Sequence, residues 1–375
     1  MGLKQPLKPA PSLADLRRFA VARSLFGPTT LGRAINKLGF VQADPIRAPA
    51  RAQDLTLRHR VTNYRAGDLE NKYQKLGVEE DYFVNYGYLP AATQALMHPR
   101  SPRRAWAPDE LKMARNVLAF VQEQGVAHPR DVDAHFSHGT AKNWFGGKSN
   151  VSTQLLDRMH YHGMLRVARR ESGTRLYSVR EESPTPDEPQ AVLDNLVDVI
   201  VRKYAPLPSA SLGQLVSKLM VGVPQWQNQR NAALKRAMGR LSHAKVDGVD
   251  WYWPAGERWQ GLAGGEDRAR CLAPFDPVVW DRRRFEQLWG WAYRFEAYTL
   301  AAKRKLGYYA LPLLWRDQVI GWANAAVTAP SLQVEIGLTG SHRMSRDLRR
   351  ALDAEVASMA AFLGVEENSW KLLVR

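Results

Sequence analysis

The residues whose types and spacing could do chemistry are Gln42 and Asp44, in the stretch GFVQAD at positions 39–44. Residues 31–38 have a helical pattern, and Gly39 suits the left-handed end of that helix, so a strand is expected next. Side chains alternate along a strand, which places Gln42 and Asp44 on one exposed face, about 6–7 Å apart. A carboxylate there could orient or deprotonate a water and stabilise developing positive charge, while the amide holds the water. The sequence therefore predicts a hydrolytic pair; the alternative is an exposed tripeptide without a role.

The charge of the chain indicates a polyanionic partner. The formal net charge is +16 and the pI is about 10.0. Residues 1–65, which include the candidate pair, contain twelve Lys or Arg against three Asp, a net charge of +9. Such an excess is typical of proteins that bind nucleic acid or an anionic membrane surface. The alternative is that most of these arginines, taken singly, lie on a solvated face of the protein and bind no partner.

Other sequence features exclude several classes of protein. The apolar run of about 20 residues that a membrane span requires is absent from the sequence, and residues 1–6 lack the apolar segment of a signal peptide. Cys271 is the only cysteine in the 375 residues, which excludes an internal disulfide framework and a thiolate-rich zinc site. We therefore expect a cytoplasmic, nucleoid-associated protein without a bound metal or cofactor.

The pattern of helices and turns predicts an α+β fold of tandem winged-helix units followed by a β-rich C-terminal domain with a terminal helix. Hairpin turns at residues 171–174 and 247–248 each follow helical segments, as in a winged helix. Linkers are expected near residues 100–108 and 181–190. The predicted domains are a first unit at 12–100, a second at 108–182, a third at 188–260 and a C-terminal domain at 265–375.

Basic side chains near these elements, and one amide, are candidate contacts to DNA. They are Arg47, Arg51, Arg58, Arg60, Asn150, Arg169, Arg170, Arg282, Arg283 and Arg284. Two alternatives remain open. A winged helix also serves as a protein–protein module, and the arginines that follow Asp281 could instead form an internal ion-pair network.

Some residue groups are similar to known binding motifs but lack the residues that those motifs require at a fixed spacing. Gly146-Gly147-Lys148-Ser149 is similar to a phosphate loop, but a Walker motif needs Gly where this chain has Lys142. The histidines at 135 and 138, and at 160 and 162, lack further ligands at metal spacing. These residues therefore predict neither nucleotide nor metal binding.

The C-terminal run FDPVVWDRRR at 275–284, followed by YRFEAY at 293–298 and GYYALP at 307–312, resembles a known family. The chain is similar to the winged-helix DNA glycosylases of the YcaQ and AlkZ type, over about residues 12–365. In that family a Gln-apolar-Asp or Gln-apolar-Gln motif does the chemistry, and Gln42-Ala43-Asp44 occupies its place.

The resemblance implies a monofunctional DNA glycosylase that excises 7-alkylated purines from double-stranded DNA, including bulky adducts or interstrand crosslinks. Alkylation makes the purine a good leaving group, and its departure builds oxocarbenium character on the sugar. Asp44 would stabilise that cation and position the water, with Gln42 as a second anchor. The motif contains no lysine for a Schiff base, so an abasic site without a lyase step is expected. Whether the base is flipped stays open.

The main alternative is a non-catalytic winged-helix transcription regulator, which would dimerise on palindromic sites and would tolerate Asp44→Asn. A self-resistance role beside a genotoxin pathway would use the same chemistry on narrower substrates. For the glycosylase we expect a monomer.

Overall fold

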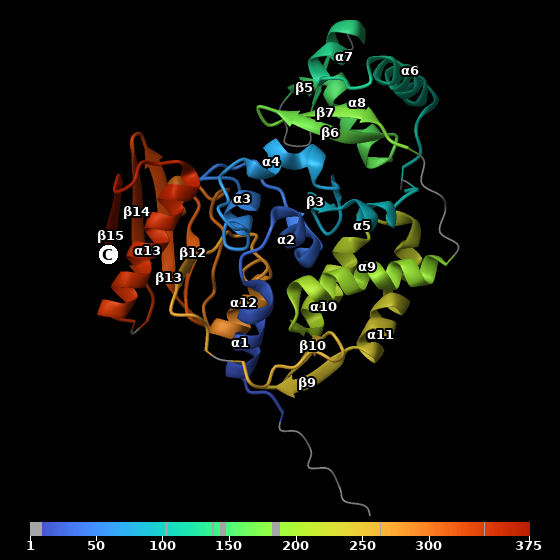
Figure 1. Ribbon diagram of the computed structural model, residues 1–375. Helices are drawn as coiled ribbons and strands as arrows, with labels where there is room; N and C mark the ends of the chain where they lie inside the picture. The colour runs from blue at the N-terminus through green and yellow to red at the C-terminus, as the bar shows by residue number, and fades with distance from the viewer. Residues whose placement is uncertain are drawn as a thin grey trace, which may run out of the picture.

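A computed structural model gives the fold and describes residues 10–101, 104–136, 139–142, 148–181, 188–262, 264–340 and 342–375. Helices and strands are mixed along the chain, and a sheet-rich region with a helix near the chain end forms the C-terminal part (Figure 1). This confirms the predicted α+β class. Within the described ranges, no helix is both long and apolar enough to cross a membrane.

The first unit surrounds the candidate motif. Ser12 and Asp15 form the capping box that begins the first helix. Gly39, at a φ of +68°, ends the second helix, as predicted. The elements are α1 (Leu13–Ser24), α2 (Leu31–Leu38), β1 (Val41–Gln42), α3 (Ala52–Leu57), α4 (Asp68–Lys72), η1 (Tyr73–Lys75), β2 (Val78–Tyr82), β3 (Tyr86–Pro90) and α5 (Ala91–Ala95).

The second and third units follow in the chain. The second contains α6 (Pro108–Gln124), α7 (Pro129–Phe136), β4 (Thr140–Lys142), β5 (Lys148–Asn150), α8 (Val151–Tyr161), β6 (Leu165–Glu171) and β7 (Thr174–Val179). The third contains α9 (Pro189–Tyr204), β8 (Leu207–Pro208), α10 (Ser209–Leu219), η2 (Pro224–Gln229), α11 (Arg230–Arg240), β9 (Ser242–Val246) and β10 (Val249–Trp253).

Among the described residues, the winged-helix order of helix, strand, two helices and two strands occurs in each unit. The last strand lies in the middle of the sheet, with the order β1-β3-β2 in the first unit and β8-β10-β9 in the third. In the second unit a single bridge between Ala127 and Tyr177 replaces the first strand. The predicted tandem repeat is therefore a repeat of structure and not of sequence. β1, which contains Gln42, is the first strand of the first unit.

Two local predictions were wrong. Helix α1 was placed in the first winged helix, but it lies outside that topology and packs against α9 and α12 (Arg282–Trp289), because Leu16, Phe19 and Ala20 are buried among the side chains of the third unit. The sequence pattern of residues 293–300 also predicts a β-like stretch, but these residues form an irregular segment that leads into η3 (Ala301–Lys303).

The C-terminal sheet is mixed rather than antiparallel. Its strands are β11 (Ala269–Cys271), β12 (Leu311–Trp315), β13 (Gln318–Thr328), β14 (Ser331–Leu338) and β15 (Trp370–Val374), in that order. The last strand pairs parallel to β14, because α13 (Arg346–Leu363) crosses one face of the sheet before the chain returns to its edge. The helix was predicted and this last strand was not.

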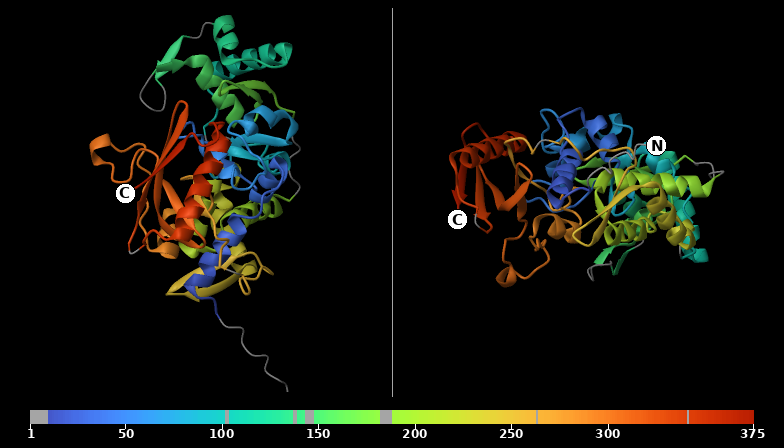
Figure 2. Two further views of the ribbon diagram at one scale, coloured as in Figure 1. Left: turned by 60° about the vertical axis from the view of Figure 1, so that its left-hand side comes forward. Right: turned by 90° about the horizontal axis from the view of Figure 1, so that it is seen from below.

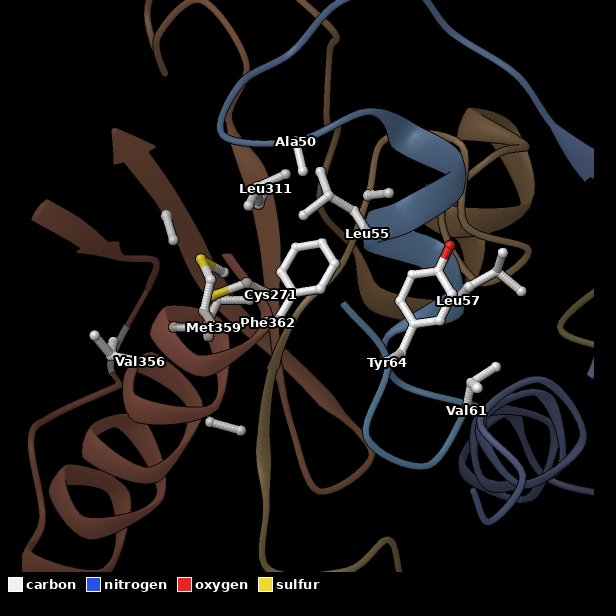
Figure 3. Packing of buried hydrophobic residues seen from close by; sticks show 14 of the residues in the cluster. Ala50, Leu55, Leu57, Val61, Tyr64, Cys271, Leu311, Val356, Met359 and Phe362 are labelled. Atoms are coloured by element: carbon white, nitrogen blue, oxygen red, sulfur yellow. The ribbon is translucent and has the colours of Figure 1, made fainter. Parts of the chain in front are cut away.

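The first unit lies between the C-terminal sheet and the third unit, as two views show (Figures 1 and 2). One apolar cluster joins it to α13 and the sheet; there Leu55, Tyr64 and Phe362 are buried together (Figure 3). Another joins Phe40 of the first unit to α1 and the third unit. The candidate motif therefore begins where the two cores meet.

The second unit has its own apolar core, and charged side chains attach it to the first. Arg166 pairs with Glu79, and Arg170 pairs with Glu80 through two hydrogen bonds of 2.8 and 2.6 Å. The glutamates lie on β2 and the arginines on β6. Arg170, a predicted DNA contact, and Arg166 on the same strand therefore bind protein carboxylates.

Three arginines that were predicted to bind DNA are buried inside the protein. Arg60 is fully buried and forms two hydrogen bonds with Asp276, of 2.7 and 3.0 Å. The guanidinium of Arg58 pairs with Glu355, and both side chains are almost fully buried. Arg284, also fully buried, donates to the carbonyl oxygens of residues 206, 277 and 278. Buried guanidinium groups do not reach phosphates, so these three predictions were wrong.

We expect Arg60→Met to destabilise the protein strongly, because it leaves the Asp276 carboxylate buried without its partner. Breaking such a pair costs about 3–5 kcal/mol. The matched control is Arg47→Met at an exposed arginine, where the change should stay within about 0.5 kcal/mol. Chemical unfolding followed by tryptophan fluorescence measures both, and the double variant Arg60→Met/Asp276→Leu should regain part of the loss. Equal effects at Arg60 and Arg47 would contradict the structural role.

Candidate active site

The position of Gln42 is fixed by the sheet of the first unit. β1 pairs with β3, so that Val41 lies opposite Tyr88 and Gln42 opposite Gly87. A Cβ at Gly87 would come within 3 Å of the Phe40 ring and would overlap the Val41 carbonyl oxygen. Only glycine therefore allows β1 to approach this closely.

Asp44 is placed by a turn and not by the strand. β1 ends at Gln42, although the Ala43 amide still donates to the Tyr86 carbonyl at 3.0 Å. The backbone N–H of Asp44 donates to Gln53 Oε1 at 3.2 Å, and its own Oδ1 accepts from the Ile46 amide at 2.9 Å. The predicted strand alternation was therefore wrong for Asp44.

Gln42 and Asp44 nevertheless line one pocket, with a volume of about 750 Å³. Both side chains are buried, with 6% and 8% of their surface exposed, so the predicted open face is in fact the wall of a pocket. We call this cavity the Asp44 pocket. The residues that line it are Gln42, Ala43, Asp44, Pro45, Arg51, Gln53, Tyr82, Asn85, Tyr86, Pro129, Thr153, Arg170, Gly173, Thr174, Arg175, Tyr177, Phe275 and Tyr298.

The Asp44 carboxylate carries an uncompensated negative charge. Burial raises its pKa, and the hydrogen bond from the Ile46 amide opposes that rise. Within the described residues, Asp44 has no ion-pair partner. A buried carboxylate with a raised pKa in a pocket is a candidate functional group, and its charge is available to a cationic ligand.

Arginines form a positive edge beside the pocket. Burial lowers the pKa of Arg51 first, and the nearby charges of Arg47 and Arg170 lower it further. The Arg51 guanidinium lies against Gly173 at the tip of the second unit's wing, where φ is +88°. Arg51 also pairs with Glu70, whereas Arg47 is exposed and has no ion pair in the described part of the chain.

Aromatic rings supply the rest of the wall. Tyr82 and Tyr86 are 5.0 Å apart in an edge-to-face arrangement. Arg175 lies 5.2 Å from the Tyr86 ring and 5.9 Å from the Tyr177 ring. On the other side is Tyr298, which is 79% exposed; its pKa is raised first by burial and then by the charge of Asp44. Such walls suit a flat ring system, through stacking.

The other residues that were predicted to contact DNA differ in their exposure and in their partners. Arg283 is exposed on α12, whereas Arg169 is half-buried on the wing and pairs with Glu171. Arg282 is half-buried and donates to the Pro274 carbonyl at 2.9 Å, with its guanidinium 4.6 Å from the Tyr293 ring. Arg282 and Arg284 therefore bind backbone carbonyl oxygens, and neither forms the predicted ion pair within the described residues. The side chain of Asn150 lies outside the described part of the structure.

Sequence reasoning missed several residues of the site. Gln53 holds the Asp44 backbone, and the Trp280 indole donates to Gln42 Oε1 at 2.7 Å. Phe275 and Tyr298 come from the C-terminal region, and Thr174 from the wing. Phe275, Trp280 and Tyr298 lie in the runs that carried the family resemblance, which was the available signal. No three His, Cys, Asp or Glu side chains of the described residues gather as metal ligands.

Two comparisons identify this combination of fold and pocket. The solved structure of the Streptomyces sahachiroi DNA glycosylase AlkZ matches with a TM-score of 0.64 at 12% sequence identity, over 97% of this chain and 100% of that chain. This match shows that the tandem winged-helix fold with its C-terminal sheet is shared with a DNA glycosylase. The sequence model of the family "DNA glycosylase AlkZ-like" matches residues 35–362. The chain therefore belongs to the AlkZ-like family, and it is a DNA glycosylase.

We expect Asp44→Asn to raise the thermal stability of the protein at neutral pH. The folded-state pKa of Asp44 is raised, so ionisation above that pKa costs stability, and the cost disappears below the unfolded pKa of about 3.9. Asparagine keeps an oxygen that can accept from the Ile46 amide. Differential scanning fluorimetry from pH 7 down to pH 4 should show the gain shrinking as the pH falls. A variant that is less stable than wild type at pH 7 would contradict an uncompensated charge.

Proposed function

We propose that this glycosylase hydrolyses the N-glycosidic bond of 7-alkylated purines in double-stranded DNA and leaves an abasic site. The observation that carries the proposal is the unpaired Asp44 carboxylate beside Gln42, in a pocket with aromatic walls and an arginine edge. A 7-alkylpurine is a flat cation attached to a polyanion. The pocket offers a negative charge for the cation, rings for stacking and guanidinium groups for phosphates.

The chemistry follows from the charge of the substrate. The C1′–N bond breaks with its electron pair moving to the purine, which neutralises the positive ring, and C1′ becomes oxocarbenium-like. Asp44 stabilises this cation electrostatically. A water oxygen then bonds to C1′, and one of its protons passes to Asp44 and from there to solvent. Because alkylation has already activated the leaving group, this sequence needs no strong general acid.

The same pocket supports a bulky adduct. Its volume of about 750 Å³ falls within the range of about 300–1,000 Å³ that holds a drug-sized ligand. A purine with a large 7-substituent, or one base of an interstrand crosslink, is of that size. The preferred adduct is therefore expected to be bulkier than a methyl group.

A hydrolytic reaction without strand cleavage fits the surroundings of the motif. A lyase would need an amine that can form a Schiff base with C1′, and lysine is absent from the described pocket wall. One lysine close to the motif, Lys203, is 3% exposed, and its ammonium donates to the Phe40 carbonyl oxygen. We propose that this lysine supports the backbone and takes no part in bond cleavage.

The arginines that are not buried inside the protein are the proposed phosphate contacts. Arg47 is exposed beside the pocket, and Arg283 is exposed on α12. Arg51 and Arg170 line the pocket and Arg169 is half-buried on the wing; each of these three also pairs with a glutamate of the protein. Together with the nucleic-acid substrate, they are consistent with a monomer that acts on the DNA of the nucleoid.

We expect Asp44→Asn to slow base release by about a hundredfold or more, because it removes the group that stabilises the cation and accepts the proton. The measurement is single-turnover release from a duplex with one 7-methylguanine, and from a second duplex with a nitrogen-mustard adduct, followed as alkali-labile breaks. The matched control is Asp250→Asn on exposed β10, which should release base like wild type. Equal rates for wild type and Asp44→Asn would assign the chemistry to other residues, and no release from either duplex would exclude this substrate class.

We expect Arg47→Ala to weaken DNA binding on any sequence and to reduce the slope of log K against log salt by about 1, because one phosphate contact is lost. Fluorescence anisotropy with an undamaged duplex at several salt concentrations measures the slope. Arg349→Ala is the control, because Arg349 lies on α13 and pairs with Asp353. A slope that changes equally in both variants would show that Arg47 does not face the DNA.

A further inference from the structure

The orientation of the Gln42 amide is set by one hydrogen bond. The indole Nε1 of Trp280 donates to Gln42 Oε1 at 2.7 Å. An indole N–H only donates, so the group that faces it must be the carbonyl oxygen of the amide and not its NH₂ group. This contact removes the twofold ambiguity that an amide side chain usually has.

Trp280 is itself held firmly. Its backbone N–H donates to the Asp276 carbonyl at 2.8 Å, and Asp276 is bound by the buried Arg60. Its ring lies 5.3 Å from the Tyr204 ring, and the Lys218 ammonium lies 5.7 Å from it. The donor is therefore in place before any substrate arrives.

The indole approaches the amide from outside the pocket. Trp280 is not one of the residues that form the pocket wall, whereas Gln42 is. With Oε1 engaged by the indole, the polar group that Gln42 has left for the pocket is Nε2 with its two N–H donors. The neighbouring Asp44 carboxylate, in contrast, can only accept. The pair thus presents a donor and an acceptor to the same space.

We propose that Trp280 is a positioning residue that makes Gln42 a hydrogen-bond donor to the attacking water. The inference rests on the hydrolysis proposed above. The water donates one proton to Asp44 and accepts one hydrogen bond from Gln42 Nε2, and its remaining lone pair is directed at C1′. The donor on Gln42 and the acceptor on Asp44 together determine the orientation of the water. Trp280 determines that Gln42 acts as the donor.

Trp280→Phe tests the role, because it removes the N–H and keeps an aromatic ring. Single-turnover base release should fall roughly tenfold, the usual effect of losing one hydrogen bond, while the concentration for half-saturation with DNA stays the same. In a Gln42→Ala background the same change should have no further effect. The matched control is Trp289→Phe, whose indole donates to the Asp317 carbonyl at 2.9 Å and which should retain the wild-type rate.

Gln42→Glu gives a second test that does not depend on the tryptophan variant. An ionised glutamate can accept from Trp280 but cannot donate, so release at neutral pH should fall at least roughly tenfold. As the pH falls, one proton is shared by the two carboxylates and restores a donor beside an acceptor. The rate of this variant should therefore pass through a maximum on the acid side, whereas wild type rises to a plateau.

The outcomes separate this inference from the proposed function. If wild type releases base and Asp44→Asn does not, but Trp280→Phe behaves like Trp289→Phe, the positioning role is overturned and the glycosylase proposal stands. A Gln42→Glu variant that is fully active at neutral pH would overturn the donor role in the same way. If wild type itself releases no base, the proposed substrate class is wrong, whatever the result with Trp280→Phe.

Discussion

The buried pair of Arg60 and Asp276 is the interaction on which the active site depends. Arg60 lies just after α3 and also donates to the carbonyl oxygens of Ser24 and Thr56, while Asp276 is the second residue of the run that contains Trp280. One guanidinium thus fixes the C-terminal run against the first unit. A charge pair is a costly way to join two segments, because both ions lose their hydration, but its geometry is strict. That strictness suits a contact that holds the segment whose Trp280 indole donates to Gln42 Oε1 at 2.7 Å.

The excess of positive charge is less available to DNA than its size suggests. Arginines of the wing bind Glu79 and Glu80, and Arg58 and Arg284 are used inside the protein. These side chains hold elements together through planar, multiply bonded contacts, which arginine makes better than lysine. The charge that can steer a duplex is concentrated near Arg47 and Arg51, next to the only uncompensated carboxylate of the described pocket wall.

Local features of the fold were predictable because local sequence determines them. The capping box at Ser12, the left-handed Gly39 and the wing hairpin each depend on a few adjacent residues. Gln42 and Asp44 were found for the same reason, although the turn that places Asp44 was not. Trp280 is 238 residues from Gln42, and nothing in its own neighbourhood shows that they meet. The burial of Arg60 was missed because a surface arginine and a buried one have the same sequence pattern, and only the partner carboxylate distinguishes them.

The pocket is assembled from parts with separate cores. Its proposed catalytic pair belongs to the first unit, whereas Thr153, Thr174 and Tyr177 come from a second unit that closes its own apolar cluster. Mutations in that unit can reshape the space around the lesion without disturbing the packing beneath Gln42 and Asp44. Substrate range and chemistry can therefore drift independently during evolution. An exchange of the second unit between relatives, with the glutamates of β2 retained as its docking points, would be the corresponding route for engineering new adduct preferences.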